Sequence, residues 1–186
     1  MLHKVLRWFY CLPISQAFLL LVIFSILTLF LRKKLRKKRF WRLGVSLFAL
    51  IWLLFIVAAT LMSRSLSESR MAPALIPFYS YYTVFAGGNR EIIRSDLMNV
   101  ALFFPAGLLL CELLPEKWRR VKKLLFVSLL LALLSAGIEY CQFSFALGQA
   151  ETDDVIHNAL GAFLGSLVCT IGFKPETTTS AEDNGG

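Results

Sequence analysis

Residues 148–167, GQAETDDVIHNALGAFLGSL, are the most informative about the fold, because a polar start runs directly into an apolar segment with regularly spaced glycines. It carries Asp153, Asp154, His157 and Asn158 at the place where the chain would enter a membrane. An ionisable group at the centre of a membrane-spanning helix costs about 2.5–3.5 kcal/mol on insertion scales. These four residues therefore need a structural or a functional explanation, and the choice depends on the layout of the whole chain.

Apolar segments of membrane-spanning length recur along the chain. Hydrophobic residues make up 57% of its 186 residues, and the mean hydropathy is +0.65. A transmembrane helix needs about 20 mainly apolar residues, and helices satisfy their own backbone hydrogen bonds in lipid. The sequence shows none of the short alternating segments of a membrane β-barrel. It therefore predicts an all-α, multi-pass transmembrane bundle of about five helices, at 12–31, 41–62, 97–114, 124–143 and 154–173.

The net charge of +8 is concentrated in two clusters, Arg32–Arg42 and Lys117–Lys123. Such clusters mark cytoplasmic loops and suit anionic lipid, so we expect membrane lipid and no nucleic acid as a partner. The 144–153 loop carries no Lys or Arg, as expected of an outside loop. The first span is predicted to be uncleaved, because a basic cluster follows it without a small-residue cleavage site. Five spans then predict an outside N-terminus and a cytoplasmic C-terminus.

Composition divides the chain into three parts. Residues 1–43 supply the first helix and a basic loop, residues 44–173 the main membrane domain, and residues 174–186 a polar tail that we expect to be disordered. The 63–96 connection contains prolines and many aromatic residues, which is typical of a segment on the outer interface. Pro105 is expected to kink the third helix or to interrupt its regular hydrogen bonding locally. The cysteines show no metal-ligand spacing, and we expect no metal and no cofactor.

Spacing places the polar groups of the last two spans on defined helix faces. Ser135, Glu139 and Gln142 follow one another at steps of four and three, so they share one side of the fourth helix. Asp154 and Asn158 are four apart and share one side of the fifth helix. An aspartate in the first turn of that helix also suits its dipole, which explains one of the two aspartates there by structure alone.

The predicted topology brings these groups to one depth. Asn99 and Asn158 each lie about one turn below the outer start of a helix, and Glu139 lies about one turn short of an outer end. Because the topology was derived from Lys and Arg alone, this agreement is independent evidence. We therefore predict one polar pocket near the outer leaflet, formed by Asn99, Glu139, Gln142, Asp154 and Asn158.

Small residues predict close helix packing in the same spans. Gly161 and Gly165 form a G-x-x-x-G pattern on the side of the fifth helix that carries its polar groups, and Gly107 lies on the third helix. Such glycines let another helix approach closely. The pattern does not say whether that helix belongs to the same chain or to a second copy, so oligomerisation stays open.

At these residues the chain resembles the VanZ family, membrane proteins named for a teicoplanin-resistance protein. The resemblance extends over residues 44–172, so that the first helix is an addition. The matching segments follow in the family's order and spacing: LIPF at 75–78, NVALFFPAGLLL at 99–110, IEYCQFSFALG at 138–148 and DDVIHNALGAFLG at 153–165.

The resemblance implies a bacterial cytoplasmic membrane protein with a link to glycopeptide susceptibility. The family's recurring polar positions fall on the five pocket residues, and its glycines fall on Gly107, Gly161 and Gly165. Many relatives carry an Arg shortly before the aspartate motif, where this chain reads GQAE, and an Asn where this chain has Ala74. If an Arg–carboxylate pair matters in those relatives, the candidates to replace it here are Arg90 and Arg94.

Three classes of function stay open. The first is an envelope factor that binds, alters or shields a lipid-linked cell-wall precursor or a lipoglycopeptide. The second is an intramembrane enzyme with Glu139 or Asp154 as general base, although no nucleophile with an adjacent base is visible. The third is a small proton-coupled carrier in which Glu139 titrates, although no internal repeat is present. His157 is expected to be a bystander or a hydrogen-bonding residue rather than a metal ligand, because it lacks an HExxH-like partner.

Overall fold

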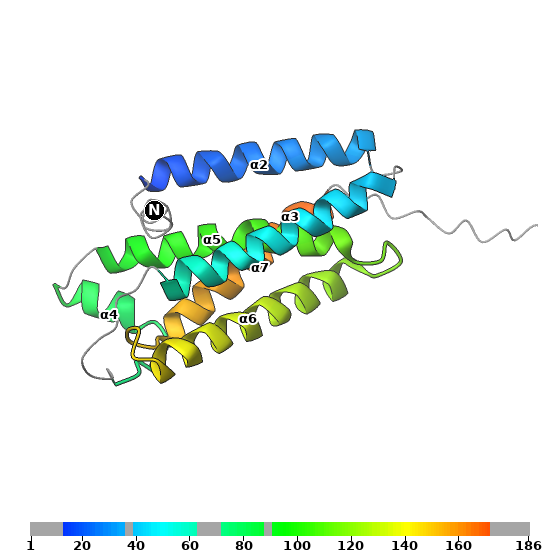
Figure 1. Ribbon diagram of the computed structural model, residues 1–186. Helices are drawn as coiled ribbons and strands as arrows, with labels where there is room; N and C mark the ends of the chain where they lie inside the picture. The colour runs from blue at the N-terminus through cyan, green and yellow to red at the C-terminus, as the bar shows by residue number, and fades with distance from the viewer. Residues whose placement is uncertain (1–12, 36–38, 63–71, 88–90, 172–186) are drawn as a thin grey trace, which may run out of the picture.

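The computed structural model describes residues 13–35, 39–62, 72–87 and 91–171, and this part of the chain is helical apart from short connections. Five helices are long and apolar enough to cross a membrane. They lie side by side, with the short α4 at one end of the bundle (Figure 1). The all-α, multi-pass prediction is therefore confirmed. The elements are α2 (Ile14–Leu35), α3 (Arg39–Val57), the π-helical turn η1 (Ala58–Met62), α4 (Tyr79–Phe85), α5 (Glu91–Leu113), α6 (Arg120–Ser144) and α7 (Thr152–Ile171).

The long helices extend further into the polar segments than the hydropathy pattern predicts. The last turn of α2 contains Arg32, Lys33 and Lys34, which were expected in a loop. Cations are favourable at a helix C-terminus because they complement its dipole, and Lys and Arg are good helix formers. Likewise α5 begins at Glu91 rather than near Asp96, with an acid in its first turn. Hydropathy marks the apolar length of a helix, whereas dipole and propensity set its ends.

The central helix of the bundle is α5. In its most apolar stretch 72% of the residues are buried inside the protein, compared with 17% in the peripheral α2. Its closest neighbour is α7, and the two helices meet through glycines. A Cβ atom on Gly161 would overlap the backbone of Val100, and one on Gly165 would overlap the backbone of Phe104. On the other side of this seam, Gly107 lies against the backbone of Ala162. The two glycines of the G-x-x-x-G pattern on α7 thus contact α5 of the same chain.

Pro105 lies inside α5, and the helix runs on through it to Leu113. Pro105 therefore does not end the helix, although it has no N–H to donate to the preceding turn. Next to it, the indole Nε1 of Trp52 on α3 donates to the Leu102 carbonyl oxygen at 3.0 Å. This bond joins α3 to the same stretch of the central helix.

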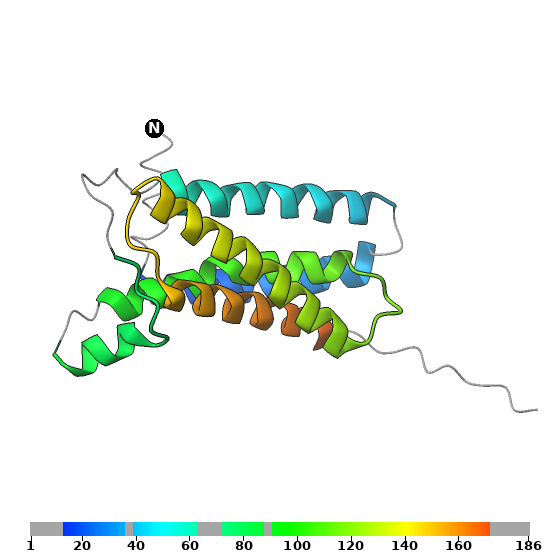
Figure 2. The same cartoon turned by 90° about the horizontal axis from the view of Figure 1, so that it is seen from below.

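The two ends of the bundle differ in chemistry. At one end, named here the basic end, α2 finishes with Arg32, Lys33 and Lys34 and α6 starts at Arg120. At the opposite end, named here the polar end, α4 lies beside the starts of α5 and α7 in both views (Figures 1 and 2). The apolar core lies between the two ends, and its fully buried members include Leu102, Phe103, Ala106, Leu108, Val127, Leu131 and Ala162.

Candidate functional site at the polar end

A short backbone pairing joins the segment before α4 to the loop before α7. The Ala74 N–H donates to the Ala150 carbonyl at 2.9 Å, and the Thr152 N–H donates to the Ala74 carbonyl at 3.0 Å. From α6, the Glu139 carboxylate accepts the Glu151 N–H at 3.0 Å. Glu139 therefore anchors the loop that leads into the aspartate motif.

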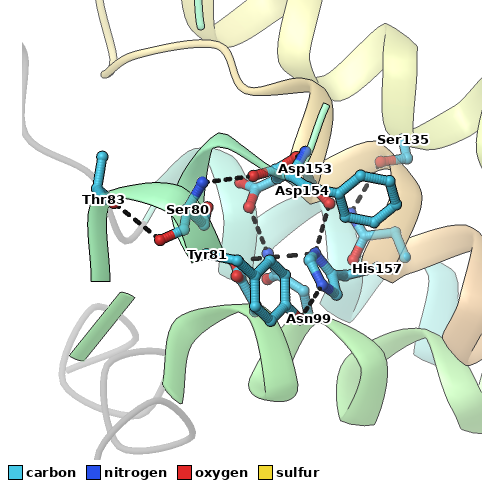
Figure 3. A network of polar contacts seen from close by, with 11 residues as sticks. Ser80, Tyr81, Thr83, Asn99, Ser135, Asp153, Asp154 and His157 are labelled. Carbon is cyan, nitrogen blue, oxygen red and sulfur yellow. Dashed lines mark hydrogen bonds and ion pairs between the residues drawn. The ribbon is translucent and has the colours of Figure 1, made fainter. Parts of the chain in front are cut away.

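Asp153 caps a helix other than its own. Its carboxylate accepts the backbone N–H groups of Phe78 and Ser80, the second at 2.8 Å (Figure 3). Phe78 has a left-handed backbone, with φ of 62°, and supplies no side-chain cap to the start of α4. The first N–H groups of a helix lack intrahelical acceptors, so a carboxylate there satisfies them and suits the dipole. Both aspartates lie in the first turn of α7, as expected, but the Asp153 carboxylate bonds to the start of α4 instead, across 75 residues of sequence.

His157 lies at the centre of the site. Its Nδ1 donates to the Asp153 carbonyl at 2.7 Å, because a backbone oxygen can only accept. The hydroxyl of Tyr81 lies 2.8 Å from Nε2, and the Asp96 carboxylate lies 3.9 Å from Nδ1. Burial raises the pKa of the Tyr81 hydroxyl, and the charges of Asp96 and Asp153 raise it further. The hydroxyl is therefore protonated at neutral pH and can donate to Nε2 of His157 (Figure 3).

Two side-chain pairs join the spans below this network. The Asn99 amide on α5 donates to the Asp154 carboxylate on α7 at 2.7 Å. The Asn158 amide on α7 donates to the Ser135 hydroxyl on α6 at 2.8 Å (Figure 3). All four residues are buried. Each bond thus ties α7 to a different neighbour at the polar end.

Gln142 holds the end of α3. Its amide donates to the Thr60 carbonyl in η1 at 3.2 Å, and its side chain is buried. The last carbonyls of a helix lack intrahelical donors, so this bond supplies one. The amide therefore has a structural partner as well as its predicted place in the polar group.

The predicted pocket residues all come to the polar end and are all buried. The structure brings Asn99 and Asp154 into direct contact and pairs Asn158 with Ser135. Three further acceptor oxygens in this region are buried without a hydrogen-bond partner: Asp96 Oδ2, Gln142 Oε1 and Asn158 Oδ1. The residues form an interhelical polar cluster, and an open pocket at this place stays a prediction.

Sequence reasoning missed part of this cluster. It left His157 as either a bystander or a hydrogen-bonding residue, and the structure shows the second. It placed neither Tyr81 nor Asp96 among the pocket residues. The step of four between Asp153 and His157 was an available signal. No local pattern could have found Tyr81, because its partner is 76 residues away.

Two other expectations concern charge partners and metals. Arg94 pairs with Glu91 at 3.4 Å on the partly exposed first turn of α5. Arg90 lies outside the described residues. In the part of the chain that the structure describes, no group of three or more His, Cys, Asp or Glu side chains could hold a metal ion.

Comparisons with known proteins agree with the sequence motifs. The family model VanZ/LLP1 matches residues 40–173, from the second residue of α3 to beyond the end of α7. Over 123 residues the chain is 33% identical to Protein VanZ of Enterococcus faecium, with 66% of this chain and 68% of that protein covered. No solved structure gives a significant match. This multi-pass helical membrane protein therefore belongs to the VanZ/LLP1 family.

Proposed function

We propose that the protein acts in the bacterial cell envelope and lowers susceptibility to glycopeptide and lipoglycopeptide antibiotics such as teicoplanin. The observation that carries this proposal is the buried polar cluster, to which α5, α6 and α7 all contribute in a chain of the VanZ/LLP1 family. Interhelical hydrogen bonds in membranes contribute under about 1 kcal/mol on average. Packing alone is therefore a weak reason to keep several buried acids, and ligand binding is a stronger one.

The chemistry of the cluster favours a ligand rich in donors. The buried oxygens of Asp96, Gln142 and Asn158 without hydrogen-bond partners are all acceptors, which match hydroxyl or ammonium groups. Beside them, α4 exposes Tyr82 and Phe85, which are 72% and 89% exposed. Aromatic side chains of this kind favour the headgroup level of a membrane. A lipid-linked cell-wall precursor or a lipoglycopeptide combines such donors with an apolar tail.

The proposal requires the polar end to face the cell exterior. Placing the basic end in the cytoplasm follows the positive-inside rule and gives an outside N-terminus and a cytoplasmic C-terminus in the bacterial cytoplasmic membrane. In a cysteine-free background, a membrane-impermeant thiol reagent should label Gln149→Cys in intact cells. Its matched control, Glu116→Cys between α5 and α6, should be labelled only after lysis. The reverse pattern would remove the proposal.

Susceptibility measurements test the function itself. Expression in a susceptible bacterium should raise the teicoplanin concentration needed for inhibition, and Glu139→Gln, Asp154→Asn and Asn158→Ala should each reduce that gain. Tyr140→Phe is the matched control, because Tyr140 follows Glu139 and is 72% exposed. Membrane levels of all variants are measured by immunoblot. Equal susceptibility with and without the wild-type chain would exclude the proposed function.

An intramembrane enzyme is the second candidate, favoured by the Asp96–His157 pair. Glu139 and Asp154, the bases first considered, already accept from the Glu151 N–H and the Asn99 amide. Asp96 instead combines a nearby imidazole with a buried oxygen that has no partner, which suits a general base better. Mass spectrometry of envelope lipids should then reveal a product that disappears in Asp96→Asn. Unchanged lipids would exclude this candidate and leave the binding function standing.

A further inference from the structure

A shallow groove of about 460 Å³ lies along the exposed side of α6, at the basic end. In Figure 1 this helix forms the edge of the bundle opposite α2. The lining residues follow one another along α6 at steps of three and four, so they share one side of the helix. Two are cations at the start of the helix and four are apolar: Arg119 and Lys122, and Val121, Leu125, Phe126 and Leu129.

The apolar part of the groove faces away from the protein. Leu125 and Leu129 are 64% and 63% exposed. Because α6 is one of the five candidate membrane spans, lipid hydrocarbon surrounds this surface. Leu129 lies seven residues beyond Lys122, which is about 10 Å along a helix. The groove therefore extends from cations at the headgroup level into the hydrocarbon region.

Trp118 positions one of these cations. The Lys122 ammonium lies 4.2 Å from the centroid of the Trp118 ring, within the range of a cation–π contact. The same ring packs edge-on against Phe126, with the two centroids 5.3 Å apart. The Lys122 side chain is therefore held at the groove, and ordering it on ligand binding costs less than for a freely moving lysine.

The surroundings of the groove are strongly positive. Residues 116–123, EKWRRVKK, contain five cations and one acid. The N-terminal end of the α6 dipole adds to this potential, and no side chain of the described residues caps that end. Arg32 at the same end of the bundle is buried against Glu112, whereas Arg119 and Lys122 are exposed and line the groove themselves. A matching ligand joins an anion to a hydrocarbon chain.

We propose that this groove binds an anionic phospholipid, with its phosphate at Arg119 and Lys122 and an acyl chain along Leu125 and Leu129. The occupant follows from charge complementarity, because basic residues near a bilayer surface attract anionic headgroups. A zwitterionic lipid fills the apolar part equally well but gains less from the two cations. The groove is at the opposite end of the bundle from the proposed ligand site, so either proposal can fail without the other.

Tryptophan fluorescence measures occupancy, because Trp118 contacts the lining residues Lys122 and Phe126. In a chain whose other tryptophans are changed to Phe (Trp8, Trp41 and Trp52), vesicles with brominated phosphatidylglycerol should quench Trp118 more than vesicles with an equal share of brominated phosphatidylcholine. We expect about a fivefold preference in relative affinity, the effect of a single cation near an anionic membrane surface. Equal quenching of Trp118 by the two lipids would overturn the proposal.

Two double variants separate the groove from the general attraction of a basic surface. Arg119→Gln with Lys122→Gln should abolish the preference for phosphatidylglycerol. The matched control, Lys33→Gln with Lys34→Gln, removes two exposed cations from the same end of the bundle and should keep it. A preference that survives the first change, or that both changes reduce equally, would refute the groove as the site.

Two further measurements keep the test independent of the tryptophan substitutions and of the kind of anion. Native mass spectrometry of the unaltered chain should show retained phosphatidylglycerol, and the variant Arg119→Gln with Lys122→Gln should lose it. Size-exclusion chromatography in detergent checks that each variant is folded. Inorganic phosphate should not displace the lipid; displacement would indicate a site for soluble anions instead. Quenching lost as the protein-to-lipid ratio rises would show that a second copy covers the groove, and would also refute the lipid site.

Discussion

Two buried carboxylates at opposite ends of the bundle have different kinds of partner. At the basic end, Glu112 meets the Arg32 guanidinium at 3.2 Å and the Trp41 indole N–H at 3.2 Å. At the polar end, Asp153 meets two backbone N–H groups, those of Phe78 and Ser80. The first arrangement pairs charge with charge between helices, and the second uses charge to cap a short helix.

The contrast between these two carboxylates indicates which end of the bundle tolerates change. The Arg32–Glu112 pair joins the peripheral α2 to the central α5, and the Arg32 guanidinium also donates to the Cys169 carbonyl on α7 at 2.9 Å. At the basic end, the buried Arg32 side chain therefore links α2 to both α5 and α7. The Asp153 contacts hold α4, whose aromatic side chains are exposed, so the polar end joins a buried cluster to a surface segment. We expect global effects from changes at the first end and local effects at the second.

The largest effect is expected at the Arg32–Glu112 ion pair. Arg32→Met removes the guanidinium that pairs with the buried Glu112 carboxylate, and breaking a buried pair in this way costs about 3–5 kcal/mol. The free energy of unfolding in detergent should fall by that amount, and Arg32→Met with Glu112→Leu should recover much of it. Lys33→Met is the control, because Lys33 is exposed. If Arg32→Met were as stable as wild type, the ion pair would not be needed to hold α2 against α5.

An intermediate and local effect is expected at Asp153. Asp153→Ala leaves the N–H groups of Phe78 and Ser80 without their acceptor, at a cost of about 1–3 kcal/mol. Amide hydrogen exchange should therefore speed up in α4 and much less in α5 and α6. Asp154→Ala, which removes the partner of Asn99, should leave exchange in α4 close to wild type. A uniform increase over the whole bundle would contradict the assignment of Asp153 to α4.

The smallest effect is expected at Tyr81. Tyr81→Phe removes one hydrogen bond, to His157 Nε2, and should lower stability by about 0.5–1.5 kcal/mol. The imidazole signals of His157 in an NMR titration should shift as well, because Nε2 loses its donor. Tyr82→Phe is the neighbouring control, since Tyr82 is 72% exposed. Identical His157 spectra in the two variants would count against the Tyr81 contact.

Local patterns predicted much of this architecture. Apolar length gave the five spans, and steps of three and four placed Asp154, Asn158, Gly161 and Gly165 on one side of α7, where Asp154 and both glycines contact α5. Helix ends were less accurate, because charge and propensity extend α2, α5 and α6 beyond the apolar windows. The segment from Pro73 to Phe85 was predicted only to lie at the membrane interface. Its helix, α4, was not predicted, because seven helical residues leave no long periodic signal.

Hydrophobic segments, helical spacing and charge clusters were enough to predict a helical membrane bundle with polar groups at one end and cations at the other. Hydropathy, spacing and charge are local properties, so they can be read without knowing how helices meet. Three contacts became visible only in the folded protein: Asp153 caps α4, Tyr81 hydrogen-bonds to His157, and Arg32 forms an ion pair with Glu112. Each of these contacts joins residues more than 70 positions apart, and which of the available partners a buried polar group finds depends on how the helices are rotated and packed.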